Sequence, residues 1–589
     1  MPEDAGIRTL ADIPRFQARR AGDTALLGAP RGRMERTTYR DLDRATRGVR
    51  HMAEEAGLEP GDRTGLLMPN ARRWIPAYFG LLQAGAVVVP LNYDHMEEEQ
   101  DKLFHALSDA GARAVFAHPD DVEACRRIVP PCIETVVPVP HIDELAESPP
   151  AVRDAPVEPG DRAQILYTSG TTGPGKGVVL THRNVVSNAR MCCRRLHIYS
   201  TDRVPAFLPY HHAFPLTASV VLPLYAGARI AVGDFRSPAA RRLLPRIRPT
   251  LLVGVPRVFE SLLDAIRSSA RREGRVGQLG RLKEISRGLN RWTGLNAGRL
   301  LLASLHRKLF GGLQLRFGVS GGARLRTEVF REYAAMGIPL LQGWGMTELS
   351  PVGAVQEFCP WTFYLTRRYE RRAGSVGRPM PGTSVRLSEA FEGEAGARQR
   401  GVGEVVVNGP HVMEGYLDAP EETARRRTEH GLKSEDLAVR GERGDLYLVG
   451  RTQQVIVLPN GKKVFPDRDL HDEIASCPGV DEFTIMAVEQ PGRGERIGLV
   501  IRPCLSACRD GGAETVGDVY RLIRGQIMDA LADKPDYMRD LDFCLTPLAD
   551  DEFAELSKNA AHEPCPSKNE FRPERCYRRM KDSETPLPE

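Results

Sequence analysis

QILYTSGTTGPGKGVVLTHRN, residues 164–184, is the stretch that decides the fold and most of the chemistry. An apolar run at 165–167 leads into a loop of glycines and hydroxyl side chains, and a second apolar run follows at 178–180. Glycines let the backbone approach phosphate oxygens, and successive N–H groups form an anion-binding nest. The segment therefore predicts a phosphate-binding loop between two strands. Its expected contacts are Thr168, Ser169, Gly170, Thr171, Thr172 and the charged Lys176.

Residues 170–176 also fit the GxxxxGK pattern of a Walker loop. Two features argue against that interpretation. Gly177 stands where a Walker loop needs Ser or Thr to hold magnesium. Residues 178–180 predict a strand, whereas a Walker loop runs into a helix. The pattern indicates another kind of phosphate loop.

Outward from this loop, residues 38–117 alternate between helical and strand patterns. TYRDLDRATRGVRHMAEEAG has helical spacing, and RTGLLMPN, AGAVVVPLN and RAVFA are typical of buried strands. Alternation of this kind predicts an α/β fold with a mostly parallel sheet. The pattern continues to about residue 320, giving two α/β subdomains, and from about 370 short strands with glycine turns predict a β-rich subdomain.

The chain then divides into unequal parts. We expect a large N-terminal domain over 1–450 and a small α+β domain over 451–558. Residues 559–589 carry Pro, charge and little apolar content, so we expect a disordered tail.

Composition excludes several function classes. The 589 residues include 81 basic and 77 acidic side chains, a balance without the footprint of a nucleic-acid-binding protein. Eleven cysteines lack paired spacing, which indicates free thiols in a reducing cytoplasm. The first residues lack a signal-peptide pattern, and we expect no integral membrane segment.

Residues 264–308 form an Arg-rich stretch with helical patterning, with eleven Lys or Arg against two Glu. Contact with a membrane surface or with coenzyme A phosphates is one interpretation. A solvated helical insertion is the other, and composition favours it.

YTSGTTGPGKGVVLTHRN resembles the signature loop of the adenylate-forming (ANL) superfamily, which contains acyl-CoA synthetases, luciferases and peptide-synthetase adenylation domains. The resemblance extends over residues 30–556 and includes PGDRTGLLMPN and LQAGAVVVPLN. It implies a large domain that binds nucleotide and acid and a small mobile C-terminal domain. In that family a carboxylate attacks the α-phosphate of ATP, and a thiol then takes the acyl group from the acyl-adenylate.

The resemblance also assigns residue roles. GWGMTE, residues 343–348, is similar to the adenylate motif: Trp344, between Gly343 and Gly345, would stack on adenine, Thr347 would contact the α-phosphate, and Glu348 would hold Mg²⁺. The loop on the adenine edge would comprise Gly321, Gly322 and Ala323, the ribose would lie on Asp436 and Arg451, and Gly461 would line the coenzyme A tunnel. Ser434-Glu435-Asp436 replaces the common Thr-Gly-Asp, and Gln453 occupies the hinge position.

LPYHHAF, residues 208–214, resembles the acid-pocket motif of long-chain acyl-CoA synthetases, with His212 at the gate of the pocket. A purely structural role for the His pair is the alternative. Amino-acid-activating domains place an Asp in this region to pair with the substrate ammonium. None occurs between Leu208 and Leu222, so we expect an apolar acyl group.

One departure concerns the adenylation lysine, which the family carries in a loop like P-x-x-T-x-x-G-K. The corresponding PLADDEFAELSKN, residues 547–559, has Glu555 at the lysine position. A preorganised donor of that kind contributes roughly 3–4 kcal/mol. A carboxylate instead repels phosphate by about 4 kcal/mol at a separation of about 4 Å and an effective dielectric constant of about 20. We therefore expect impaired adenylation.

Three hypotheses remain open. The first is a ligase that moves the acyl group of a preformed acyl-adenylate to coenzyme A, with a separate adenylating enzyme as partner. The second is a complete ATP-dependent synthetase that uses Lys558 or another cation, with Mg²⁺. The third is a nucleotide-binding pseudoenzyme. The Arg-rich composition and the missing lysine also resemble acyl-CoA ligases of platensimycin-type diterpenoid antibiotic biosynthesis.

Overall fold

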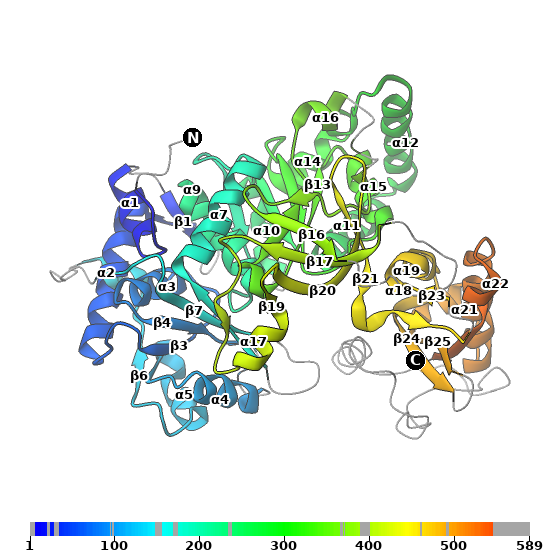
Figure 1. The fold of residues 1–589 in the computed structure, drawn as a ribbon. Helices are drawn as coiled ribbons and strands as arrows, with labels where there is room; N and C mark the ends of the chain where they lie inside the picture. The colour runs from blue at the N-terminus through cyan, green and yellow to red at the C-terminus, as the bar shows by residue number, and fades with distance from the viewer. Residues whose placement is uncertain are drawn as a thin grey trace.

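The alternating pattern around residues 38–117 builds a seven-stranded sheet, drawn on the left of Figure 1. The computed structural model describes residues 6–20, 24–28, 34–94, 96, 99–147, 156–168, 175–233, 238–365, 369, 372–388, 401–459, 462–490 and 494–545. The strand order is β18-β8-β7-β4-β3-β5-β6. Its strands are β3 (Arg63–Leu67), β4 (Val87–Pro90), β5 (Ala114–Ala117), β6 (Thr135–Pro138), β7 (Arg162–Tyr167), β8 (Gly177–Thr181) and β18 (Gly415–Tyr416). From β6 to β7 all neighbours are parallel, which confirms the predicted fold class.

Helices cover both faces of this sheet because its strands are apolar on both sides. Leu66, Val88 and Phe116 belong to the main core with helices α2 (Tyr39–Glu55) and α3 (Trp74–Gln83). The alternate residues Leu67 and Val115 belong to a separate cluster with α4 (Gln100–Asp109) and α5 (Val122–Ile128). The two-residue period of a strand thus divides the apolar residues between the two layers.

A capping box fixes the start of α2. Thr38 accepts a hydrogen bond from the backbone N–H of Asp41, and the Asp41 side chain accepts one from the Thr38 backbone in return. This arrangement satisfies N–H groups that have no partner within the helix. The helical spacing recognised in the sequence is therefore a helix in the structure, with its apolar side against α3.

Two further sheets complete the α/β part. The first has the order β2-β1-β10-β9 and the second β11-β12-β13-β14-β15. Their strands are β1 (Thr24–Gly28), β2 (Glu35–Thr38), β9 (Arg203–Ala206), β10 (Arg229–Val232), β11 (Leu251–Gly254), β12 (Phe317–Ser320), β13 (Leu340–Gly345), β14 (Val352–Val355) and β15 (Arg378–Pro379). Their helices include α1 (Asp12–Arg20), α7 (His182–Leu196), α9 (Leu222–Ala226), α10 (Pro238–Ile247), α15 (Thr327–Ala335) and α16 (Pro360–Leu365).

The β-rich part is an antiparallel sheet, as its glycine-bounded strands predict. Its strands are β16 (Ser384–Ser388), β17 (Gly403–Asn408), β19 (Arg427–Thr428), β20 (Gly431–Arg440) and β21 (Leu446–Arg451). The short helix α17 (Pro420–Arg426) lies between β18 and β19 in the chain.

The Arg-rich stretch 264–308 is helical, as predicted, and projects at the upper right of Figure 1. It comprises most of α11 (Pro256–Arg272), α12 (Val276–Thr293), α13 (Gly298–Leu301) and most of α14 (Ala303–Phe310). Lys283 and Arg287 of α12 form ion pairs with Glu332 of α15, so part of its charge anchors the helix.

Residues 456–538 contribute a separate hydrophobic core. Its strands are β22 (Ile456–Val457), β23 (Lys463–Val464), β24 (Val480–Gln490), β25 (Gly494–Pro503) and β26 (Leu541–Leu545), and its helices are α18 (Pro466–Asp469), α19 (His471–Ala475), α20 (Leu505–Asp510), α21 (Val516–Ala530) and α22 (Asp536–Arg539). The short 3₁₀ helix η6 (Thr452–Gln454) connects it to β21. The boundary at residue 450 stays a prediction, and the predicted tail 559–589 lies outside the described residues. Among the described residues, no helix combines the length and the apolar character needed to span a bilayer.

Candidate active site

A cavity of about 1060 Å³ lies where the three sheets of the large part meet the β-rich part. It collects most of the residues that the sequence indicated, from segments far apart in the chain. The predicted site residues that line it are Thr168, Lys176, His212, Gly321, Gly322, Gly343, Trp344, Gly345, Thr347, Glu348, Asp436 and Arg451. Ala323 follows Gly322 but is not among the lining residues.

The predicted phosphate loop lies between β7 and β8 in the chain. Strands β7 and β8 pair antiparallel, and the N–H of Thr168 donates to the Lys176 carbonyl at 3.1 Å. This geometry confirms that a strand follows the loop, so the Walker interpretation is wrong. Ser169, Gly170, Thr171 and Thr172 lie outside the described residues.

Lys176 faces α17 across the mouth of this hairpin. Its Nζ lies 2.8 Å from Glu422 Oε1 and 5.6 Å from the centroid of the Tyr416 ring. The hydrogen bond from Lys176 lowers the pKa of Glu422. The lysine is half-exposed, so a phosphate group that enters the cavity can compete for its charge.

Trp344 and Asp436 are joined by a direct hydrogen bond. The indole Nε1 donates to Asp436 Oδ2 at 2.7 Å, and Arg451 Nε lies 3.3 Å from Oδ1. Asp436 and Arg451 are cross-strand partners in the register of β20 and β21. Burial raises the pKa of Asp436, while Arg451 and Trp344 act in the opposite direction. The buried carboxylate thus has two donors, and it lies where a sugar hydroxyl could exchange with them.

Two glycines make room for the Trp344 indole and for the strand that carries it. A Cβ on Gly353 would lie 2.6 Å from the Trp344 ring, so the ring packs flat against a bare backbone. A Cβ on Gly345 would lie 1.9 Å from the Pro351 carbonyl oxygen, a clash with backbone. The short approach of β13 to the turn before β14 therefore requires glycine at residue 345.

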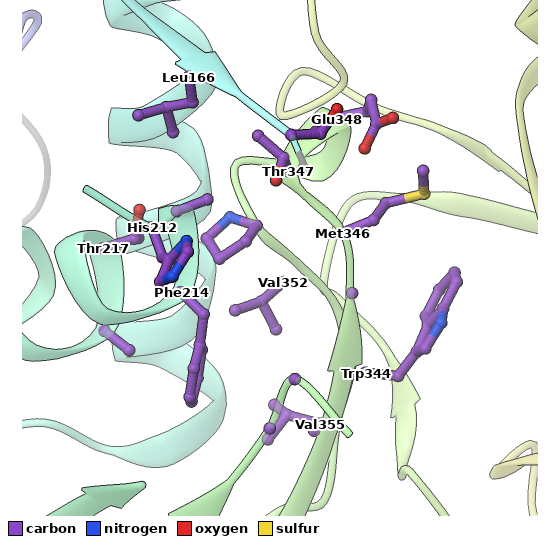
Figure 2. A pocket seen from close by; sticks show the side chains of 18 of the residues that line it. Leu166, His212, Phe214, Thr217, Trp344, Met346, Thr347, Glu348, Val352 and Val355 are labelled. Carbon is purple, nitrogen blue, oxygen red and sulfur yellow. The ribbon is translucent and has the colours of Figure 1, made fainter. Parts of the chain in front are cut away.

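Glu348 is buried in the short helix η4 (Thr347–Leu349) and accepts a hydrogen bond from the Tyr416 hydroxyl at 2.7 Å. Burial, and next the charge of Glu348, raise the pKa of Tyr416, so the phenol stays a donor. Thr347 and Glu348 lie at one end of the cavity in Figure 2.

The other side of the cavity is largely apolar. Figure 2 shows His212, Phe214, Thr217 and Val352 gathered there, with Trp344 apart from them at the right of the view. Thr217 belongs to the π-helical segment η3 (Leu216–Val221) and Val352 to β14, and further apolar lining residues come from β9, β11, β12 and α7. His212 directly precedes the one-turn helix α8 (Ala213–Pro215), and its ring centroid lies 4.1 Å from that of His211. Gly321 lets Phe214 approach, because a Cβ there would lie 2.9 Å from the ring.

Two further predicted residues, Gly461 and Glu555, lie outside the described residues, like the four residues 169–172 of the predicted phosphate loop. Their roles stay predictions. Conversely, the sequence analysis missed Tyr416 and Arg426, which both line the cavity. Only the long-range pairing of β18 with β8 brings Tyr416 there, and local patterning carries no signal of it.

The residues present can be compared with the groups that the sequence resemblance implies. A buried carboxylate beside a flat aromatic ring suits the sugar and base of AMP, and one carboxylate beside a hydroxyl suits Mg²⁺, which is usually held by one or two carboxylates together with substrate phosphates. Within the described ranges, no three His, Cys, Asp or Glu side chains form a metal cluster.

Comparison with known proteins agrees with this geometry. Residues 14–417 match the family described as AMP-binding enzyme. The feruloyl-CoA synthase of an Amycolatopsis species is 28% identical over 507 residues, which cover 86% of this chain and 89% of that protein. The long-chain-fatty-acid–CoA ligase of Escherichia coli O157:H7 is 27% identical, over 79% of this chain and 81% of that protein.

Solved structures share the fold. ATP-bound MatB from Rhodopseudomonas palustris superposes with a TM-score of 0.71 at 23% identity, over 94% of this chain and all of that one (100%). The anthranilate CoA ligase AuaEII, in complex with anthranoyl-AMP, superposes with a TM-score of 0.71 at 19% identity, over 95% of this chain and 99% of that one.

Proposed function

The chain belongs to the AMP-binding enzyme family, and we propose that it is an acyl-CoA ligase that works chiefly by transferring the acyl group of an acyl-adenylate to coenzyme A. The observation that carries the proposal is the two-sided cavity. Trp344 and Asp436 line one part of it, and an apolar group around Phe214 lines another part of the same cavity. An acyl-adenylate has the same two-sided character.

The polar side accounts for nucleotide binding. Adenine lies against Trp344 and the loop at Gly321 and Gly322, and the ribose hydroxyls bond to Asp436 with Arg451 beside it. Thr347 donates to the phosphate, and Lys176 with the glycine loop provides further positive charge and donors.

The apolar side takes the acyl group, with His212 at its edge as a gate. The names of the two curated relatives, a feruloyl-CoA synthase and a long-chain-fatty-acid–CoA ligase, support an apolar carboxylic acid. The resemblance to ligases of platensimycin-type pathways makes diterpenoid acids the first acyl groups to test.

The transfer step needs little from the small domain's lysine position. The thiolate sulfur of coenzyme A bonds to the acyl carbonyl carbon, the bond from that carbon to the phosphate oxygen breaks, and AMP leaves with the electron pair. The thiol proton passes to solvent. Adenylation, in contrast, brings a carboxylate to the α-phosphate, and Glu555 in place of lysine opposes that approach. Mg²⁺, when bound at Glu348, would neutralise phosphate charge during pyrophosphate departure.

The test separates the two half-reactions. Purified protein receives a panel of acyl-adenylates with coenzyme A, and thiol consumption and AMP release are followed. In parallel it receives the same acids with ATP and Mg²⁺, and pyrophosphate is measured. We expect thioester formation from adenylates and much slower pyrophosphate release.

Two outcomes would decide against the transfer proposal. Pyrophosphate release as fast as thioester formation would indicate a complete synthetase that uses Lys558 or another cation. Nucleotide binding without either half-reaction, across the panel, would indicate a pseudoenzyme. A separate adenylating enzyme as partner and a cytoplasmic location stay predictions.

A further inference from the structure

Arg426 is a cation within the cavity wall that no sequence motif announced. It is the last residue of α17, its side chain is only 12% exposed, and it lines the cavity. Its Nη1 lies 2.5 Å from Glu435 Oε2, and its Nε donates to the Lys433 carbonyl at 3.0 Å. Two bonds from two directions hold the guanidinium in one orientation.

The partner Glu435 occupies an unusual backbone position. Its φ is +65°, in the left-handed region that favours glycine. A glutamate there carries a conformational cost of about 1 kcal/mol or more. The side chain at this strained position forms the ion pair with Arg426.

Arg426 keeps its positive charge in the cavity wall. Burial lowers the pKa of Arg426, but the effect of its neighbours Tyr416, Glu435 and Glu348 outweighs burial, so the net direction is upward. Arg426 therefore remains charged.

The connectivity of a nucleotide then locates its phosphate. Phosphate is bonded to the ribose, so it must lie between the ribose site at Asp436 and the hydroxyl of Thr347. Arg426 is anchored beside the Asp436 end of this interval, because its ion-pair partner Glu435 directly precedes Asp436 in the chain. All of these residues line the same cavity.

We propose that Arg426 binds the phosphate of the acyl-adenylate and takes up the negative charge of AMP as it leaves. A guanidinium carries five N–H donors. Nε and Nη1 are engaged by Lys433 and Glu435, while the described part of the chain includes no hydrogen bond from Nη2. This inference rests on the proposed function, since it assigns a residue to the same site.

Ligand pairs that differ only in phosphate give the test. The affinities of AMP and adenosine are measured by calorimetry for the wild type, Arg426→Met and Arg426→Lys. The matched control is Arg427→Met, which removes the next arginine, an exposed residue outside the cavity lining. A charge-assisted hydrogen bond predicts a loss of AMP affinity of about ten-fold or more in Arg426→Met. Adenosine affinity should stay constant, and Arg426→Lys should keep part of the preference for AMP.

A second variant guards against a merely structural effect. Arg426→Met strands the Glu435 carboxylate, so Arg426→Met combined with Glu435→Gln is measured as well and should show the same selective loss. If the variants keep the wild-type preference for AMP over adenosine, the role of Arg426 is refuted while the proposed function stands. Equal loss of both ligands also refutes it, because that result indicates a structural role. A wild type that binds neither ligand refutes the proposed function together with this inference.

Discussion

Replacing Asp436 by asparagine tests the ribose site with little disturbance elsewhere. Asparagine has nearly the same shape and can still accept the indole hydrogen bond of Trp344. Arg451 loses its charged partner, but its side chain is 52% exposed, so no buried charge is left without solvation. The substitution therefore changes mainly the strength of hydrogen bonds that a ribose would make.

The magnitude follows from the burial of the carboxylate. The Asp436 side chain is 15% exposed, so solvent screens it weakly. Hydrogen bonds to a charged group contribute about 1.5–3 kcal/mol and neutral ones about 0.5–1.5 kcal/mol. Two ribose hydroxyls would then lose roughly 2–3 kcal/mol, which is about 30- to 150-fold in AMP affinity.

The assay compares AMP with an analogue whose ribose lacks both hydroxyls, by calorimetry at neutral pH. The loss should appear with AMP and largely vanish with the analogue. Asp445→Asn is the matched control, because that side chain is equally buried, at 16% exposed, but lies outside the cavity lining. An equal loss for both ligands, or no loss for AMP, would refute the assignment of Asp436 to the ribose.

Three further predictions concern metal, charge and pH. In a transfer-only enzyme, Glu348→Ala should lower the rate of thioester formation from acyl-adenylate by less than about ten-fold, because no pyrophosphate departs; a loss of several orders of magnitude in that rate would contradict this. Glu555→Lys should raise ATP-dependent pyrophosphate release by about ten-fold, roughly 1.4 kcal/mol, and leave thioester formation from adenylate within a few-fold; unchanged pyrophosphate release would count against charge repulsion as the block. Burial lowers the pKa of His182 from 6.5 to about 4, and its Nδ1 accepts from the Leu10 N–H. Neutral His182 therefore contributes fully to the free energy of unfolding above about pH 6.5. That contribution declines by about 3 kcal/mol as the pH falls toward about 4. Denaturant unfolding of wild type and His182→Asn across this range measures it, and parallel pH profiles would disprove it.

Much of the site was predictable because its residues lie in short segments with strong local chemistry. Glycine and hydroxyl groups around Lys176, and the run from Gly343 to Glu348, carry their own signals. The first segment joins β7 and β8 of the seven-stranded sheet, the second ends β13 of another sheet, and residues of both line the same cavity. The fold class followed from the alternation of helical and strand periods for the same reason.

The site residues that the sequence did not predict depend on tertiary pairing between strands. Strand β18 has only two residues and joins the sheet through Gly415 and Val179, far apart in the chain. Strand β20 reads GLKSEDLAVR, a polar sequence whose strand character comes from pairing on both sides. Tyr416 and Arg426 reach the cavity through such contacts, and no local period announces them.

The hairpin of β20 and β21 has one more consequence. Arg451 ends β21, directly after Gly450, whose φ of +149° suits glycine, and directly before the segment 452–454 that leads to the second core. If the second core rotates, as the resemblance predicts, we expect the rotation to begin beside Arg451, the residue that pairs with Asp436. Nucleotide binding and the orientation of the second core would then be coupled: nucleotide would shift the equilibrium between orientations, and the orientation would change the nucleotide affinity by the same factor. A bound nucleotide would act as a latch on the orientation, and the orientation would set how long the nucleotide stays.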